Sequence, residues 1–246
     1  MSGLVLALLL SLLASVSASA GVPEGKTQYE VRYKWGVVDT RVANAVFTVT
    51  REERDGQPAL HSQVNLRATP FFRLFLVEEY RVDLFLSADG KKPLFSHAPL
   101  KKKGKETLFD VLYDWDARVA ELHTVSVDEN IVKTFPMEER PMDIFALFYF
   151  MQTLDISEFK EGEPLPLIIM MPRSEAPVLV CYEGIDTQEI PETECHRFLL
   201  QFTGRGMMEN RSGNTVHIWS SAEGDHKLLR LTVPLNNGVM VARMKQ

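Results

Sequence analysis

Residues 29–37 read YEVRYKWGV, and this stretch decides the fold class. Its apolar residues alternate with polar or small ones, a period of two that is typical of a β-strand with one buried face. Apolar runs of strand length, separated by turn residues, return along most of the chain: at 43–49, 60–66, 80–86, 109–115, 119–127, 168–171, 178–182, 198–202, 216–219, 228–233 and 239–244. Many short strands with regular turns predict an antiparallel sheet or barrel.

Two segments break this pattern. Residues 141–154 (PMDIFALFYFMQTL) begin with a proline, carry Asp143 in the first turn and place apolar side chains on every face, which is typical of a buried helix. Residues 69–77 (TPFFRLFLV) predict a shorter helix with proline in its first turn. The expected fold is therefore mainly β, a strongly curved antiparallel sheet or incomplete β-barrel. One buried helix (about 141–154) lies in its concave face, and one short helix (about 69–77) accompanies it.

The composition is that of a globular protein, with 45% of the 246 residues hydrophobic and 24% charged. With 27 basic and 33 acidic residues the net charge is −6, and no basic stripe offers a surface for nucleic acid. Cys181 and Cys195 lie on strands expected to be consecutive. An exported chain could join them in a disulfide, and the sequence leaves this open.

The N-terminus has the features of a signal peptide. The thirteen residues 4–16 are apolar except for two serines, and Ala18 and Ala20 fit the small-residue rule for cleavage. The run is shorter than the roughly 20 residues that span a bilayer, and no basic residue precedes Lys26. We expect residues 1–20 to be a signal peptide, and residues 21–246 to form a single β-rich exported domain without a transmembrane span. The alternative is an apolar helix that packs on the domain.

Motifs for catalysis or metal binding are missing from the sequence. The six histidines lack the spacing of a metal site, and no nucleophile or phosphate-loop signature occurs. We therefore expect a protein that is not an enzyme, with no catalytic residue, no metal-ligating residue and no cofactor.

Phenylalanines are concentrated in the two segments outside the strands, namely Phe71, Phe72, Phe75, Phe145, Phe148 and Phe150. They either fill the core or line an apolar cavity open to a lipid-like ligand, because such pockets are mostly apolar with few polar groups. These six are the candidate ligand-binding residues. The basic run at 101–105 (KKKGK) is either a hairpin tip that its charge keeps soluble or a contact for anionic lipid.

The layout resembles a family of exported bacterial proteins. The start YEVRYKWGVV…ANAVFTV, the helix PMDIFALFYFMQTLD followed by EGEPLPL, the strands VLVCYEG…TECHRFLL and the end VHIWSSAEGDHKLLRLTVPLNNGVMVARM are similar to domain of unknown function family 3108. The end departs from that family in lacking a proline between its first two strands. The resemblance implies a β-rich protein of the periplasm or exterior of a Gram-negative bacterium, without a known activity. A weaker likeness, to the curved half-barrels of periplasmic lipoprotein carriers, concerns the fold alone.

Two non-enzymatic functions follow from these observations. The first is a periplasmic or exported protein that binds a hydrophobic or lipid-like small molecule in the concavity of the curved sheet. The second is a structural or interaction module of the Gram-negative cell envelope, with another envelope protein as its partner. A cavity inside the sheet favours the first function, and a filled core favours the second.

Export can be tested by sequencing the N-terminus of the protein purified from its own host. Cleavage after Ala20 predicts that the mature chain begins at Gly21. Recovery of a chain that retains Met1 in a soluble cytoplasmic fraction would contradict this prediction.

Overall fold

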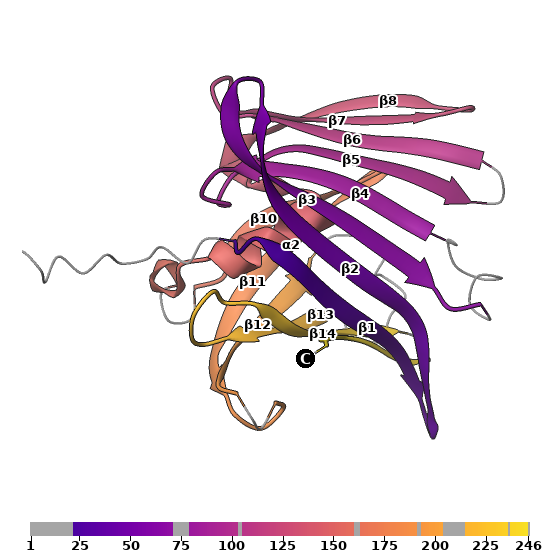
Figure 1. The fold of residues 1–246 in the computed structure, drawn as a ribbon, viewed down its shortest axis with the longest axis vertical. Helices are drawn as coiled ribbons and strands as arrows, with labels where there is room; N and C mark the ends of the chain where they lie inside the picture. Colours follow the sequence, from indigo (N-terminus) through magenta and orange to yellow (C-terminus); the bar gives the residue numbers. More distant parts are fainter. Residues whose placement is uncertain are drawn as a thin grey trace, which may run out of the picture.

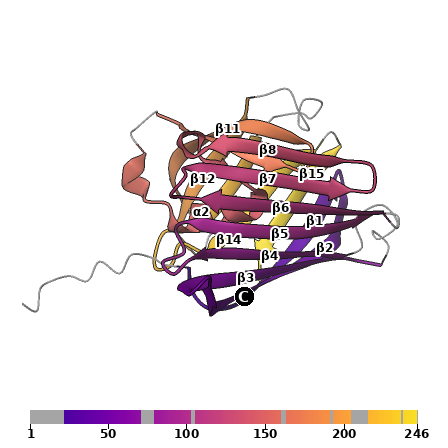
Figure 2. The same cartoon turned by 90° about the horizontal axis from the view of Figure 1, so that it is seen from above.

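The computed structural model describes residues 22–70, 79–102, 105–159, 163–190, 193–203, 215–235 and 237–245. Within these ranges fifteen strands form one sheet, in the order β8-β7-β6-β5-β4-β3-β2-β1-β15-β14-β13-β12-β11-β10-β9. The sheet curls into a nearly closed barrel around a single described α-helix (Figures 1 and 2). The expected fold class, a mainly β incomplete barrel, is confirmed.

The chain forms two antiparallel meanders with a helical connection between them. The first comprises β1 (Gly25–Trp35), β2 (Val38–Arg54), β3 (Gln57–Ala68), β4 (Glu79–Ser87), β5 (Pro93–Lys102), β6 (Lys105–Asp114), β7 (Val119–Ser126) and β8 (Asn130–Pro136). The connection comprises the 3-10 turn η3 (Met137–Glu139), β9 (Pro141–Met142), α2 (Ile144–Thr153) and the 3-10 turn η4 (Ile156–Glu158). The second comprises β10 (Leu165–Met171), β11 (Ser174–Asp186), β12 (Cys195–Phe202), β13 (Thr215–Ser221), β14 (Leu228–Leu235) and β15 (Gly238–Met244).

Pairing of β1 with β15 joins the two meanders, with Tyr29 opposite Met244 and Lys34 opposite Val239. The alternation seen in the sequence has its expected result here, because Tyr29 and Val31 on β1 are buried while Glu30 between them is not. β8 was not singled out from the sequence. Only Phe135 is buried on this edge strand, so its apolar pattern is weak.

The helix begins three residues later than predicted. Pro141 and Met142 form β9, which pairs in parallel with Ile168 and Ile169 of β10, so the prediction that Pro141 starts the helix was wrong. Asp143 is the N-cap, and its carboxylate accepts hydrogen bonds from the backbone N–H groups of Phe145 (2.8 Å) and Ala146 (3.0 Å).

Burial of the helix is uneven. Leu147, Tyr149 and Met151 are buried, whereas Ile144 in the first turn is 52% exposed. The predicted short helix at 69–77 lies outside the described residues except for Thr69 and Pro70.

The barrel has two distinct ends. Because the strands are antiparallel, the turns β1–β2, β7–β8, β10–β11 and β14–β15 all lie at one end, which we call the open end. The start of β1, the end of β15 and the β13–β14 connection lie at the other. α2 lies toward this second end, which we call the helix end, since Phe148 contacts Tyr29 near the start of β1 (Figure 1).

Both cysteines are free thiols. The register places Leu199 opposite Cys181 and Asp186 opposite Cys195, so the two residues do not face each other on β11 and β12. Burial raises the pKa of each thiol, and a nearby carboxylate raises it further.

A charge in the helix tests its packing. We expect Leu147→Asp to unfold or aggregate the protein, because Leu147 is 3% exposed and an unpaired buried charge costs several kcal/mol, out of a total stability of about 5–15 kcal/mol. The matched control is Ile144→Asp, three residues away on the same helix, which should change the free energy of unfolding by less than about 0.5 kcal/mol. Thermal unfolding measures both, and equal small effects would contradict the observed burial.

Candidate functional site

The concave interior of the barrel is the candidate site, and α2 lies toward its helix end. A buried hydrogen-bond network fixes where the helix begins. Tyr113 Oη on β6 donates to Asp143 Oδ2 (2.9 Å) and accepts from the backbone N–H of Asp143 (2.9 Å). Burial, then the charge of Asp143, raises the pKa of Tyr113 well above its usual range, so this hydroxyl remains a donor at physiological pH.

Aromatic rings fill the helix end of the interior. Phe148 stacks on Phe47 of β2 with 4.3 Å between ring centroids, and its edge meets Tyr29 at 5.7 Å. Beyond α2 in the sequence, the ring centroid of Phe159 lies 5.8 Å from that of Phe198 and 6.0 Å from that of Tyr182. These contacts belong to the main hydrophobic core, so this end of the barrel is packed.

The predicted ligand-binding phenylalanines divide into two groups. Phe145, Phe148 and Phe150 are half-buried and pack against the main core, and the ring of Phe145 lies 6.0 Å from that of Tyr80. For Phe148 the stack on Phe47 corresponds to the core-filling interpretation. Phe71, Phe72 and Phe75 lie outside the described residues.

The open half of the interior is apolar and less well filled. Leu231 on β14 lies opposite the buried Ile218, so it faces inward, and Val233 shares its face two residues on. Both are only half-buried. A second hydrophobic cluster lies nearby, with Val31, Val42 and Ala43 buried and four half-buried members: Tyr33, Leu66, Met240 and Ala242. No residue of α2 belongs to this second cluster.

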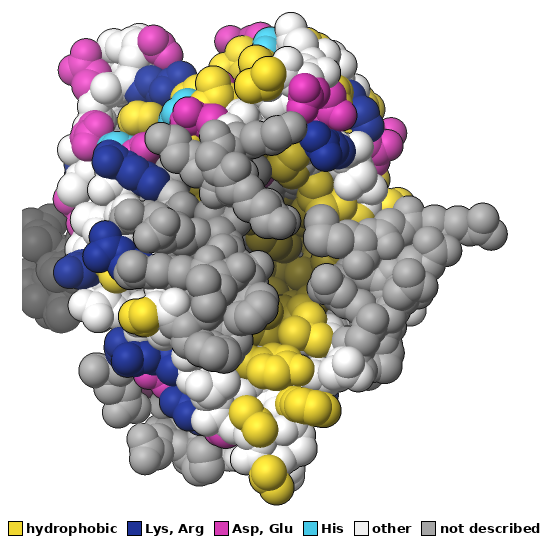
Figure 3. Space-filling model, turned by 90° about the vertical axis from the view of Figure 1, so that its right-hand side faces the viewer, with side chains coloured by type: hydrophobic (Ala, Val, Ile, Leu, Met, Phe, Trp, Pro, Cys, Tyr) yellow, Lys and Arg dark blue, Asp and Glu magenta, His cyan; other side chains and the backbone are white. Residues whose placement is uncertain are grey.

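Figure 3 looks into the open end and shows a hollow with hydrophobic side chains on its walls. The half-buried residues Leu231 and Val233 of β14 and the half-buried members of the second cluster are apolar side chains that face the interior. They were not among the candidates from the sequence, because an inward residue of a strand normally fills the core. Only the packing of the folded chain shows which of them stay half-buried.

Two hydroxyls on the inner wall have no hydrogen-bond partner. Ser96 on β5 and Thr124 on β7 are buried, and neither hydroxyl oxygen is satisfied by the described residues. They lie on strands that flank β6, where Phe109 is opposite both Ala98 and Thr124. An unmade hydrogen bond in an interior costs about 1–3 kcal/mol.

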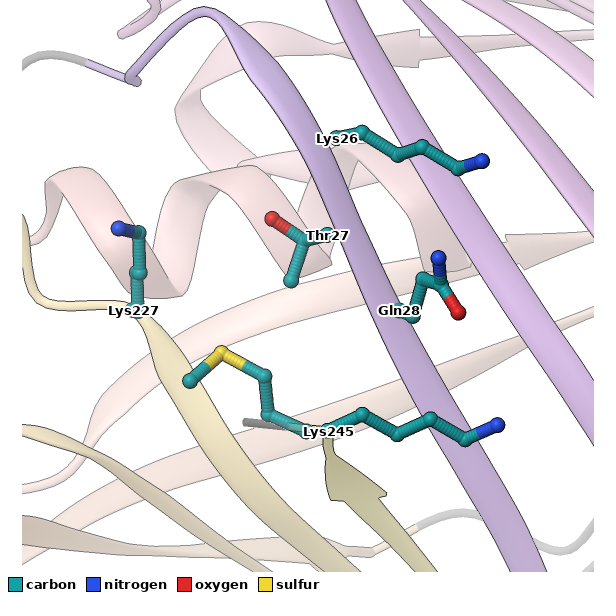
Figure 4. Close-up of a pocket in the computed structure, with 6 residues that line it drawn as sticks. Lys26, Thr27, Gln28, Lys227 and Lys245 are labelled. Atoms are coloured by element: carbon teal, nitrogen blue, oxygen red, sulfur yellow. The ribbon is translucent and has the colours of Figure 1, made fainter.

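A polar pocket of about 370 Å³ lies at the helix end, lined by Lys26, Thr27, Gln28, Lys227, Met244 and Lys245 (Figure 4). Its three ammonium groups point in different directions rather than toward a common point. Two of them already have partners, since Lys227 pairs with Asp225 (3.0 Å) and Lys245 donates to Asn44 (3.1 Å). This pocket is therefore a weaker candidate for a specific anion than the hollow is for an apolar molecule.

Two histidines lie close to other titratable side chains. His61 lies between carboxylate oxygens of Glu52 and Asp83, 3.0 Å from each, and its hydrogen bond lowers the pKa of Glu52. His196 Nδ1 lies 3.0 Å from Tyr182 Oη, and burial followed by the proximity of His226 lowers the pKa of His196. Neither cluster includes a nucleophile. Across the described ranges no group of three or more His, Cys, Asp or Glu side chains is arranged to hold a metal ion.

None of the helices in the described part of the chain is long and apolar enough to cross a membrane.

One solved structure supports the fold. The chain is similar to the beta-barrel-like protein of domain of unknown function DUF1849 from Brucella abortus, with a TM-score of 0.54 and 9% identity over 90% of this chain and 95% of that one. It also matches a candidate exported protein with a YmcC-like fold from Bacteroides fragilis NCTC 9343, with a TM-score of 0.37 and 8% identity over 92% and 98% of the two chains. No curated protein matches the sequence.

A family model confirms the resemblance found in the sequence. The model for DUF3108, described as a protein of unknown function, matches residues 28–245. Because this match spans most of the chain, the protein belongs to the DUF3108 family.

Proposed function

We propose that this protein is a non-enzymatic, exported carrier that binds a hydrophobic or lipid-like molecule in the open half of its barrel. The observation that carries the proposal is an apolar inner wall that is incompletely buried. Leu231 and Val233, which pack against the main core, and Met240 in the second cluster face the interior yet remain half-buried. Apolar surface of this kind is stabilised when an apolar ligand removes it from water, by about 25 cal/mol per Å².

The shape of the interior supports binding at the open half rather than around the helix. The helix end is packed with aromatic side chains, whereas the open half ends in the hollow of Figure 3. A mostly apolar site of this kind suits the acyl chain of a lipid-like molecule.

The proposed location is the periplasm of a Gram-negative bacterium or its exterior. The support comes from the sequence, through the apolar run at 4–16 and the small residues Ala18 and Ala20. An extractable apolar ligand would be available there from the surrounding membranes. Native mass spectrometry of the protein purified from its own host, followed by solvent extraction, identifies a bound lipid directly.

Substitutions on β14 test the binding site. Leu231→Gln and Val233→Gln place an amide on the apolar wall, and we expect each to raise the Kd for a fluorescent fatty acid by about tenfold or more, because the amide loses hydrogen bonds to water when the probe covers it. Since both positions are half-buried, the variants should still fold. Thr232→Gln is the matched control, because Thr232 lies between them and faces the other side of the strand.

Truncation of an aromatic side chain on α2 tests the packing at the helix end. Phe148→Ala should destabilise the protein by an amount near the lower end of the ~3–5 kcal/mol typical of buried phenylalanines, because it loses the stack on Phe47. If the wild type binds no probe and carries no lipid, the carrier proposal fails. The envelope interaction module would then be the better explanation.

A further inference from the structure

Two histidine rings lie close together at the helix end of the barrel. His196 is the second residue of β12, and His226 lies far from it in the sequence, in the β13–β14 connection. Their ring centroids are 5.4 Å apart. His196 shares the inward face of its strand with the buried Phe198, so the pair lies at the rim of the interior. Both histidines are half-buried, which leaves them accessible to a small solute.

Each ring is held through its Nδ1 atom. His226 Nδ1 lies 3.0 Å from the carbonyl oxygen of Ser221, and His196 Nδ1 lies 3.0 Å from Tyr182 Oη. Because a carbonyl oxygen only accepts, Nδ1 of His226 carries the hydrogen, and Nε2 of the neutral ring keeps a free lone pair. Among the described residues, Nε2 of neither ring has a hydrogen-bond partner. Metal-binding histidines are held in the same way, with the second ring nitrogen bonded to a carboxylate, a backbone carbonyl or water.

The distance between the two rings suits a shared tetrahedral ion. Zinc binds imidazole nitrogen at about 2.0–2.1 Å, so two imidazoles on one tetrahedral zinc ion have their ring centroids about 5.2 Å apart. The observed distance of 5.4 Å is close to this value. With the same bond length, a linear arrangement of the two rings would separate the centroids by about 6.3 Å. Calcium and magnesium are poorer candidates, because both prefer oxygen ligands.

We propose that His196 and His226 bind a zinc ion through their Nε2 atoms. Tyr182 is a positioning residue, because its hydroxyl oxygen accepts the Nδ1 hydrogen of His196 and so leaves Nε2 free for the metal. Two positions of a tetrahedral zinc ion remain for water or for a group on another molecule. The ion links the β13–β14 connection to β12. The site lies at the opposite end of the barrel from the hollow, so it does not depend on the carrier proposal.

Isothermal titration calorimetry with zinc chloride tests the site, on the metal-free full chain without a polyhistidine tag. We expect the wild type to bind one ion with a micromolar Kd. His196→Gln and His226→Asn should each raise this Kd by about tenfold or more, because each removes a ligand. Asparagine suits position 226, where φ is +46°, because it tolerates the left-handed region. Tyr182→Phe should raise the Kd by about tenfold, since loss of an orienting partner typically costs 10–100-fold in metal affinity.

The matched control is His61→Gln. His61 lies 3.0 Å from carboxylate oxygens of Glu52 and Asp83, which makes it the competing site to exclude. This variant should bind zinc as tightly as the wild type does. Weaker binding in His61→Gln together with unchanged binding in His226→Asn would overturn the proposal. A wild-type chain that binds no zinc would overturn it as well.

A labelling experiment on the wild type gives an answer even where a variant fails to fold. Diethyl pyrocarbonate modifies imidazole nitrogens that are accessible and not bound to a metal, and peptide mass spectrometry locates the modified residues. Zinc should protect His196 and His226 from modification. His61 and His123 should react equally with and without the metal. Equal modification of His196 and His226 in the presence and absence of zinc would contradict the proposed site.

Discussion

The width of the barrel is the constraint on which the rest of the structure depends. Eight strands enclose a space that their own side chains can just fill, and larger barrels leave room inside. This sheet has fifteen strands, so part of its interior needs another element. α2 supplies it at one end only, where the Asp143 cap and Tyr113 hold it against β6. The aromatic packing around Phe148 results from that placement. Leu231, which packs against the same core, is only half-buried.

The edges of the sheet show how far closure goes. β8 and β9 are the outermost strands, and the chain passes from one to the other through η3. We call the boundary between these two edges of the sheet the seam. Near it, Lys133 of β8 pairs with Glu175 of β11 (2.6 Å), and Arg173 pairs with Glu129 (2.7 Å). Charged side chains thus bridge the two meanders where no backbone ladder joins them. Such charges also discourage pairing of an edge with another chain.

Local patterns in the sequence predicted most of the fold, and long-range contacts decided the rest. The period of two identified β1 and most other strands, and the apolar run identified α2 to within three residues. The error at Pro141 arose because its pairing with Ile168, 27 positions away, cannot be read from the segment itself. The candidate site was harder to predict. Phe148 was visible in the sequence as an aromatic residue of the predicted helix, but the half-burial of Leu231 depends on contacts between distant strands, which only the folded chain defines.

The seam has a consequence for the size of what the barrel can hold. Exposed ion pairs each contribute about 0–1 kcal/mol, and salt screens them. A strand ladder, in contrast, must break several hydrogen bonds together before it parts. Thirteen antiparallel strand pairs therefore fix most of the circumference of this barrel. The circumference can change at the seam, which the ion pair of Lys133 with Glu175 crosses. A wider ligand would be accommodated if the two meanders separated along the seam, while the remaining strand pairs kept their register.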